Sequence, residues 1–165
     1  MSVGIGLEQL LDYSDYERRK WREWIAADPK RLDVAVQPGG RFPKVWDLLD
    51  HLIFVERRHL SRLEGGALPE QTGIPRGDWT RLFEYGDLVR ADMRRYVSDI
   101  DDRTASETMT FVPLGGGTVT MTRRRLLMHV MLHEVRHFAQ LALAARAAGV
   151  APPGEHDLFY FAEFD

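Results

Sequence analysis

Apolar residues recur every three or four positions in four long segments of the chain, which is the spacing of amphipathic helices. Turn signals separate the segments: Asp28-Pro29 follows the first, Gly65-Gly66 ends the second, and Pro152-Pro153 stands beyond the last. Asp78 and Thr122 are good N-cap residues for the third and the fourth segment. The last segment is apolar nearly all round, so we expect it to be the most buried element. The predicted helices cover residues 7–27, 44–64, 79–100 and 123–148.

A short segment before the last predicted helix alternates threonine with apolar residues, as half-buried strands do. Residues 108–111 (TMTF) and 119–122 (VTMT) flank a turn with three glycines at 115–117, which predicts a β-hairpin. Four long helices with short or hairpin connections predict an all-α fold, an antiparallel four-helix bundle with this hairpin before the last helix. The C-terminal tail is expected to pack back on the bundle through its apolar residues Leu158, Phe159, Tyr160, Phe161 and Phe164.

Composition narrows the possible chemistry. A chain of 165 residues with 44% hydrophobic and 28% charged residues is typical of one soluble globular domain, which we expect to span residues 1–165. The chain has no cysteine, which excludes disulfides, iron–sulfur clusters, thiolate zinc sites and a cysteine nucleophile. A net charge of -3 gives no general attraction for nucleic acid or anionic lipid, so neither is an expected partner. No run approaches the roughly 18 apolar residues of a membrane span and no secretion signal is evident, so we expect a cytoplasmic location.

Three of the six histidines, His129, His133 and His137, recur every four residues in the last predicted helix. Each step of four advances about 6 Å with only about 40° of rotation, so the three lie on one face. Two histidines four apart can bind one metal ion, and a third ligand must then come from elsewhere. His51 is the candidate, because it interrupts the apolar stretch LLDHLIFV of the second helix. We interpret His51, His133 and His137 as metal ligands; the alternative is that they are hydrogen-bonded core residues.

The other histidines are assigned lesser roles. His129 lies one turn before the pair and is interpreted as a packing residue beside the ligands. His59 and His156 are expected at the surface or in the tail. Tyr13 and Trp46 are core aromatics by default, with a pocket above the metal as the alternative place for either.

HEVRH at residues 133–137 also satisfies the H-E-x-x-H pattern, in which Glu134 would be the general base of a zinc protease. The downstream sequence lacks both the extra histidine of a metzincin and the second helix of a gluzincin, so a protease is the poorer interpretation. Glu134 is either an auxiliary proton acceptor at the edge of the metal or a salt-bridged carboxylate. Arg123, Arg124 and Arg125 open the last helix and either collect an anionic substrate group or are simply solvated.

Three stretches of the chain, LLDHLIFVERRHL, HVMLHEVRHFAQ and AGVAPPGEHDLFYF, resemble the DinB/YfiT-like family of bacterial metal-binding four-helix bundles. The resemblance spans nearly the whole chain. It implies a metal triad at His51, His133 and His137, the set also favoured by spacing. Many members carry His-His-Arg-Gly-Gln around the last ligand, whereas this chain has RHFAQ, which keeps the ligand and Gln140 but makes that shoulder of the helix apolar.

The resemblance further implies a metal-dependent enzyme, most like the thiol S-transferases that join a low-molecular-weight thiol such as bacillithiol or mycothiol to an electrophile. Zinc, nickel, iron and manganese all accept imidazole ligands, and a divalent ion stabilises bound thiolate or hydroxide at neutral pH. Since the chain has no cysteine, the sulfur would arrive with the small-molecule cosubstrate. Two other classes stay open: a non-catalytic stress or ligand-binding bundle, and a metal-dependent hydrolase. Relatives often pair, so a homodimer is expected.

Overall fold

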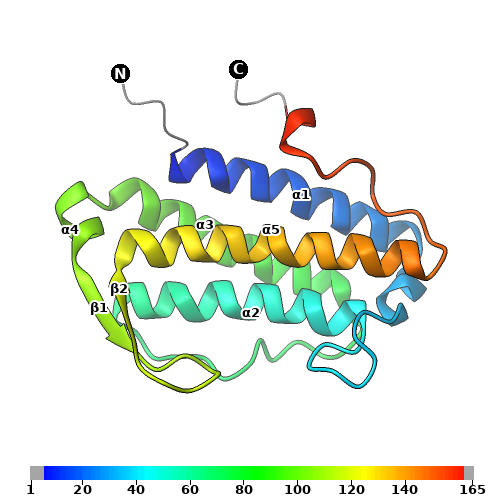
Figure 1. Cartoon of the computed structure of the whole chain (residues 1–165), viewed down its shortest axis with the longest axis horizontal. Helices are drawn as coiled ribbons and strands as arrows, with labels where there is room; N and C mark the ends of the chain where they lie inside the picture. Colours follow the sequence, from blue (N-terminus) through cyan, green and yellow to red (C-terminus); the bar gives the residue numbers. More distant parts are fainter. Residues whose placement is uncertain (1–5, 162–165) are drawn as a thin grey trace.

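The computed structural model describes residues 6–161, and within this range the chain is mostly helical, with one two-stranded antiparallel sheet (Figure 1). Helix α1 packs against α3 and α5, and α2 packs against the same two helices. The helical class, the hairpin and all four long helices were predicted and are confirmed; the short helix α4 was not predicted. The elements are α1 (Leu7–Ala27), η1 (Pro29–Asp33), α2 (Val45–Glu64), α3 (Trp79–Asp99), α4 (Asp102–Ser106), β1 (Thr108–Phe111), β2 (Val119–Thr122), α5 (Arg123–Ala147) and η2 (Leu158–Tyr160).

Local capping explains where the long helices begin and end. The Asp78 side chain accepts a hydrogen bond from the Arg81 amide at 3.2 Å, and the Thr122 hydroxyl accepts one from the Arg125 amide at 3.2 Å. Helix α2 ends at Gly65, whose φ of 72° is the left-handed conformation that glycine adopts without strain. The sequence signals at all three positions therefore mark the true helix limits.

The hairpin pairs residues 108–111 with residues 119–122, the two segments predicted as its strands. Thr108 pairs with Thr122 and Phe111 with Val119, and the hydroxyls of Thr110 and Thr120 lie 2.8 Å apart across the strands. The hairpin and α4 lie at the end of the molecule where α5 begins, opposite the loop that leads into α2 (Figure 1). The two ends of the helical body are therefore built differently.

The core consists of two apolar clusters with a polar layer between them. Trp21, Leu48, Phe83 and Leu141 belong to one cluster, and the other lies toward the opposite end of each long helix. On each long helix a buried charged residue that pairs across the core falls between the two clusters in sequence. These four residues, here named the charge layer, are Arg18 of α1, Glu56 of α2, Arg90 of α3 and Glu134 of α5, all buried.

The prediction that the last helix is the most buried is wrong. Fourteen of the 20 residues of α2 are buried, against 11 of the 25 in α5. Helix α5 has only α1 and α2 as long neighbours, so part of its apolar circumference faces outward. Met128, Leu132 and Leu143 are exposed on that side.

The C-terminal tail packs back through fewer residues than predicted. Phe161 is buried, with its ring 5.6 Å from that of Tyr13 and 5.3 Å from that of Tyr16. Leu158, Phe159 and Tyr160 are exposed, and Phe164 lies outside the described residues. One turn of 3-10 helix carries the three exposed residues, and Phe161 directly after it contacts α1.

Gly86 marks a close approach of α3 to its neighbours. A Cβ atom there would lie 2.9 Å from Cδ1 and 3.2 Å from Cγ1 of Ile53, which is itself buried in α2. The Gly86 carbonyl also accepts a hydrogen bond from Arg18 Nη1 at 3.2 Å. The absence of a side chain at Gly86 therefore makes room for α2.

We expect Gly86→Ala and Ile53→Val to be coupled. A methyl group at position 86 costs about 1–3 kcal/mol of overpacking against Ile53, which offsets the roughly 1 kcal/mol of helix propensity that alanine gains over glycine. Ile53→Val removes Cδ1, so Gly86→Ala should be more favourable by about 1 kcal/mol in that background. A double-mutant cycle of urea unfolding free energies measures this; additive free energies would show that α3 has room for the methyl group.

Candidate metal centre

His51, His133 and His137, the histidine triad, meet where α2 packs against α5. One ligand atom from each lies within 4.8 Å of the other two, and His133 Nε2 lies 3.0 Å from His137 Nε2. The His51 ring centroid is 5.3 Å from that of His133 and 5.4 Å from that of His137. The structure thus brings together the three residues selected from the sequence.

The donor set of the triad fits a divalent transition metal. Two nitrogens bound at 2.0–2.1 Å to a tetrahedral zinc ion stand about 3.3 Å apart, close to the spacing between the His133 and His137 nitrogens. Three imidazoles leave at least one coordination position for an outside ligand.

Gln140 orients one member of the triad. Its Oε1 accepts a hydrogen bond from His137 Nδ1 at 2.5 Å. A proton on Nδ1 leaves Nε2 with its lone pair, and that is the nitrogen facing His133. The sequence signal for this role is the spacing of three residues, which places Gln140 beside His137 on one helix face.

Burial keeps the triad uncharged. It lowers the pKa of His51 to about 3 and that of His133 to about 2, and the charges of neighbouring groups add to the effect. The pKa of His137 is also lowered, chiefly by burial, although the hydrogen bond with Gln140 acts in the opposite direction. Neutral imidazole is the form that binds metal, so the triad is in its ligating state at neutral pH.

Phe42 covers the triad from the loop that precedes α2. Its ring centroid is 4.3 Å from that of His51 and 5.9 Å from that of His137. The loop is held by a hydrogen bond of 2.9 Å from the Val36 amide to the Pro43 carbonyl. Tyr13 and Trp46, the aromatic residues proposed to line a pocket above the metal, do not line the pocket found here, and Phe42 has that position instead.

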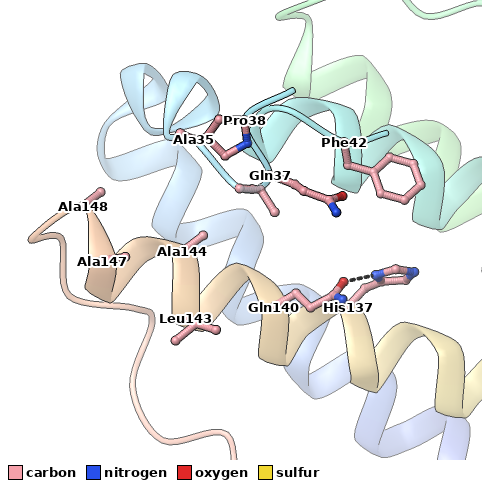
Figure 2. Close-up of a pocket in the computed structure, with 11 residues that line it drawn as sticks. Ala35, Gln37, Pro38, Phe42, His137, Gln140, Leu143, Ala144, Ala147 and Ala148 are labelled. Carbon is pink, nitrogen blue, oxygen red and sulfur yellow. Dashed lines mark hydrogen bonds between the residues drawn. The ribbon is translucent and has the colours of Figure 1, made fainter. Parts of the chain in front are cut away.

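A pocket of about 640 Å³ opens beside the triad, between this loop and the second half of α5. Figure 2 shows His137 and Phe42 together at one end of it, with Ala147 and Ala148 at the other. The Gln140 side chain lies next to His137 and carries the hydrogen bond described above. The triad is therefore continuous with a cavity of the size that small ligands occupy.

Two histidines continue the row of rings away from this pocket. His129 lies 5.5 Å from His133 and 5.6 Å from His59, measured between ring centroids. The prediction of a surface position for His59 is wrong: it is buried between α2 and α5, and burial lowers its pKa to about 3. His129, expected to pack beside the ligands, does so.

His156 was expected at the surface or in the tail; it lies in the tail and is partly buried. Its ring stacks on that of Trp21 at 5.4 Å, and Nδ1 lies 2.5 Å from Glu17 Oε2. The tail therefore returns to α1 through this histidine as well as through Phe161.

Glu134 is a salt-bridged carboxylate, the second of the two roles expected from the sequence. Its carboxylate oxygens lie 2.5 Å from Arg18 Nη2 and 2.5 Å from Arg90 Nη2, and it also accepts a hydrogen bond from the Ser14 hydroxyl. Burial alone would raise the pKa of Glu134, but the two guanidinium charges outweigh it and hold the pKa at about 2. A carboxylate held ionised by two cations is a weak proton acceptor at neutral pH.

Glu56 completes the charge layer and belongs to the residues that sequence reasoning missed. Its carboxylate lies 2.5 Å from Arg18 Nη2 and 3.0 Å from Arg90 Nε. Two cations therefore face two anions with almost no exposure to solvent. Several charged residues stand between the apolar positions of each helix, and periodicity alone does not show which of them are buried or how they pair.

The arginines that open α5 serve the nearby structure. Arg123 Nη1 donates to the Leu63 carbonyl at 2.6 Å, and Arg124 Nη2 pairs with Asp102 at 2.6 Å. Arg125 is eight residues before His133, which is about 12 Å along the helix. These contacts anchor the start of α5 to α2 and α4.

We expect Glu134→Gln to lower the free energy of unfolding by about 3 kcal/mol, because it leaves Arg18 and Arg90 buried beside a neutral amide. The matched control is Asp87→Asn, which breaks the exposed pair with Arg22 and should cost less than about 1 kcal/mol.

The folded pKa of Glu134 lies below its usual 4.5, so the stabilisation is present above pH 4.5 and is lost as the pH falls toward 2. The difference between wild type and variant should shrink over that range; urea titrations at several pH values measure it, and equal costs for the two variants would contradict the assignment.

Comparison with known proteins identifies the family. The model of the DinB family matches residues 1–162, whereas a search of curated proteins finds no match. None of the helices described between residues 6 and 161 is long and apolar enough to cross a membrane. Since the family match covers nearly the whole sequence, the chain belongs to the DinB family.

Proposed function

We propose that the histidine triad binds one divalent metal ion and that the protein is a metal-dependent enzyme, most like a thiol S-transferase. The observation that carries the proposal is the convergence of His51, His133 and His137 from two helices, with ligand atoms within 4.8 Å of one another. Membership of the DinB family supports it. In this proposal residues 1–165 form one domain, a DinB-type antiparallel four-helix bundle that pairs as a homodimer in the cytoplasm.

The donor set favours a catalytic over a structural metal. Structural sites are usually closed by four protein ligands, whereas catalytic sites keep a position open. Among the described residues, the group of converging His, Asp and Glu ligand atoms has three members. The fourth position would then be available to a ligand from solution.

A divalent ion held by three neutral imidazoles would stabilise a thiolate or hydroxide at neutral pH. The chain itself has no cysteine, so the thiol must be a cosubstrate. Two side chains of the protein position and cover the metal ligands. Gln140 holds the His137 ring by a hydrogen bond, and the Phe42 ring covers His51. Glu134 is engaged by Arg18 and Arg90 and is left out of the proposed reaction.

We expect the purified, untagged protein to hold about one divalent metal ion per chain, measured by inductively coupled plasma mass spectrometry after reconstitution. His51→Ala and His137→Ala should each remove it, since two remaining imidazoles are too few for a tight site. His129→Ala is the matched control, because this ring contacts His133 but lies outside the triad. Circular dichroism confirms that each variant is folded. Full metal occupancy in either triad variant would contradict the ligand assignment.

The same preparations distinguish transferase from hydrolase and from a non-catalytic bundle. With bacillithiol or mycothiol and the electrophile 1-chloro-2,4-dinitrobenzene, sulfur replaces chlorine on the ring and chloride leaves. We expect a rate above the uncatalysed reaction that needs both thiol and metal and falls at least about 100-fold in His51→Ala. Turnover of ester substrates without thiol would favour the hydrolase, and no turnover of either kind would favour the non-catalytic bundle.

A further inference from the structure

The pocket beside the triad is far larger than one metal-bound sulfur or water needs. Its volume is about 640 Å³, and most of its wall is apolar. Leu143 and Ala147 of α5 line one side, and Ala35 and Pro38 of the loop before α2 line the other (Figure 2). Leu143 is 68% exposed, so an apolar occupant would cover hydrophobic surface that now meets water.

Polar groups in the pocket wall are few and concentrated at the triad end. His137 and Gln140 lie there, and their side chains are hydrogen-bonded to each other. Gln37 supplies the other amide in the wall. Sugar-bearing thiols such as bacillithiol and mycothiol would leave several hydroxyls unpaired against alanine and leucine, at a cost for each. The pocket therefore suits the second substrate, the electrophile, better than the thiol.

Two arginines place positive charge beside the triad. The Arg41 guanidinium lies 5.1 Å from the ring centroid of Phe42, the ring that covers His51 and His137. Arg136 directly precedes His137 on α5 and lies seven residues, about two turns, before Leu143 of the pocket wall, so it is on the same face of the helix. Both arginines are exposed, and neither has an ion-pair partner in the part of the chain from residue 6 to residue 161.

We propose that the pocket between residues 35–42 and the second half of α5 binds the apolar body of an anionic electrophile, with its negative group facing Arg41 and Arg136. This inference rests on the proposed function, because it assigns a substrate class to the same site. The apolar wall accounts for the body of the substrate, and the two unpaired cations account for its charge. The reactive carbon of such a substrate would lie at the triad end of the pocket, where the thiol is activated.

The probes that test the proposal are 4-phenylbutyrate, its neutral alcohol 4-phenyl-1-butanol, and acetate, titrated calorimetrically into the metal-loaded full chain and again after chelation. We expect 4-phenylbutyrate to bind at least tenfold more tightly than acetate, since each buried methylene contributes about fourfold. The alcohol should bind about fivefold more weakly than 4-phenylbutyrate, since exposed charges contribute modestly. Both differences should survive removal of the metal.

Variants of the pocket locate the binding. Ala144→Phe fills the cavity and should weaken the binding of 4-phenylbutyrate at least tenfold. Ala147→Phe, at an exposed position of the same wall, replaces it if the first variant is poorly folded. The control is Ala91→Phe, which places the same side chain at an exposed position of α3. Unchanged affinity in a folded Ala144→Phe or Ala147→Phe variant would overturn the proposed pocket.

The double variant Arg41→Gln/Arg136→Gln tests the charge. It should lower the affinity for 4-phenylbutyrate to that for the alcohol and leave the affinity for the alcohol unchanged. The control Arg103→Gln on α4 should change neither affinity. Equal affinities for the two probes in the wild type would overturn the anionic class. If acetate bound as tightly as 4-phenylbutyrate, and only with metal present, coordination of the carboxylate by the metal would explain the binding. That result would overturn the proposed pocket. Metal content, measured on the same samples, shows separately whether the proposed metal centre fails.

Discussion

The charge layer is the constraint on which the rest of the structure depends. Two arginines and two glutamates are buried between two apolar clusters, one from each long helix. Buried charges are tolerated only when each finds its partners, because an unpaired one costs several kcal/mol. A slip of α5 by one turn would move Glu134 about 5.4 Å from Arg18 and Arg90. The apolar clusters would accept such a slip far more easily than the charge layer.

The charge layer and the histidine triad have helices α2 and α5 in common. Glu134 follows His133 on α5, and Glu56 lies five residues after His51 on α2. A register of α2 and α5 that satisfies both arginines is therefore also the register in which His51 faces His133 and His137. In contrast, the other wall of the site is a loop, in which Phe42 and Arg41 are held mainly by backbone contacts and ring stacking. Two long helices therefore place the triad, and a loop supplies the other wall of the pocket.

Much of this arrangement could be predicted from the sequence, because its signals are local. The sequence alone indicates the caps at Asp78 and Thr122 and the glycine at the end of α2. The four-residue spacing of His133 and His137 is another signal that depends on no contact with a distant segment. What depends on distant contacts could not be predicted in the same way. The H-E-x-x-H pattern suggested a role for Glu134 at the metal, whereas its partners come from α1 and α3. His59 looked like a surface residue because nothing local shows that α5 covers it.

The charge balance around the triad argues for an anionic ligand from outside the chain. Three neutral imidazoles leave the full charge of a divalent ion uncompensated. The carboxylates adjacent in sequence to the triad are otherwise engaged: Glu134 pairs with two arginines, and Asp50 accepts a hydrogen bond from Thr72 at 2.5 Å. Arg41 and Arg136 add further positive charge at the same place. A thiolate together with an anionic substrate would neutralise this excess, and among the described residues no carboxylate joins the three histidines in the group of converging ligand atoms.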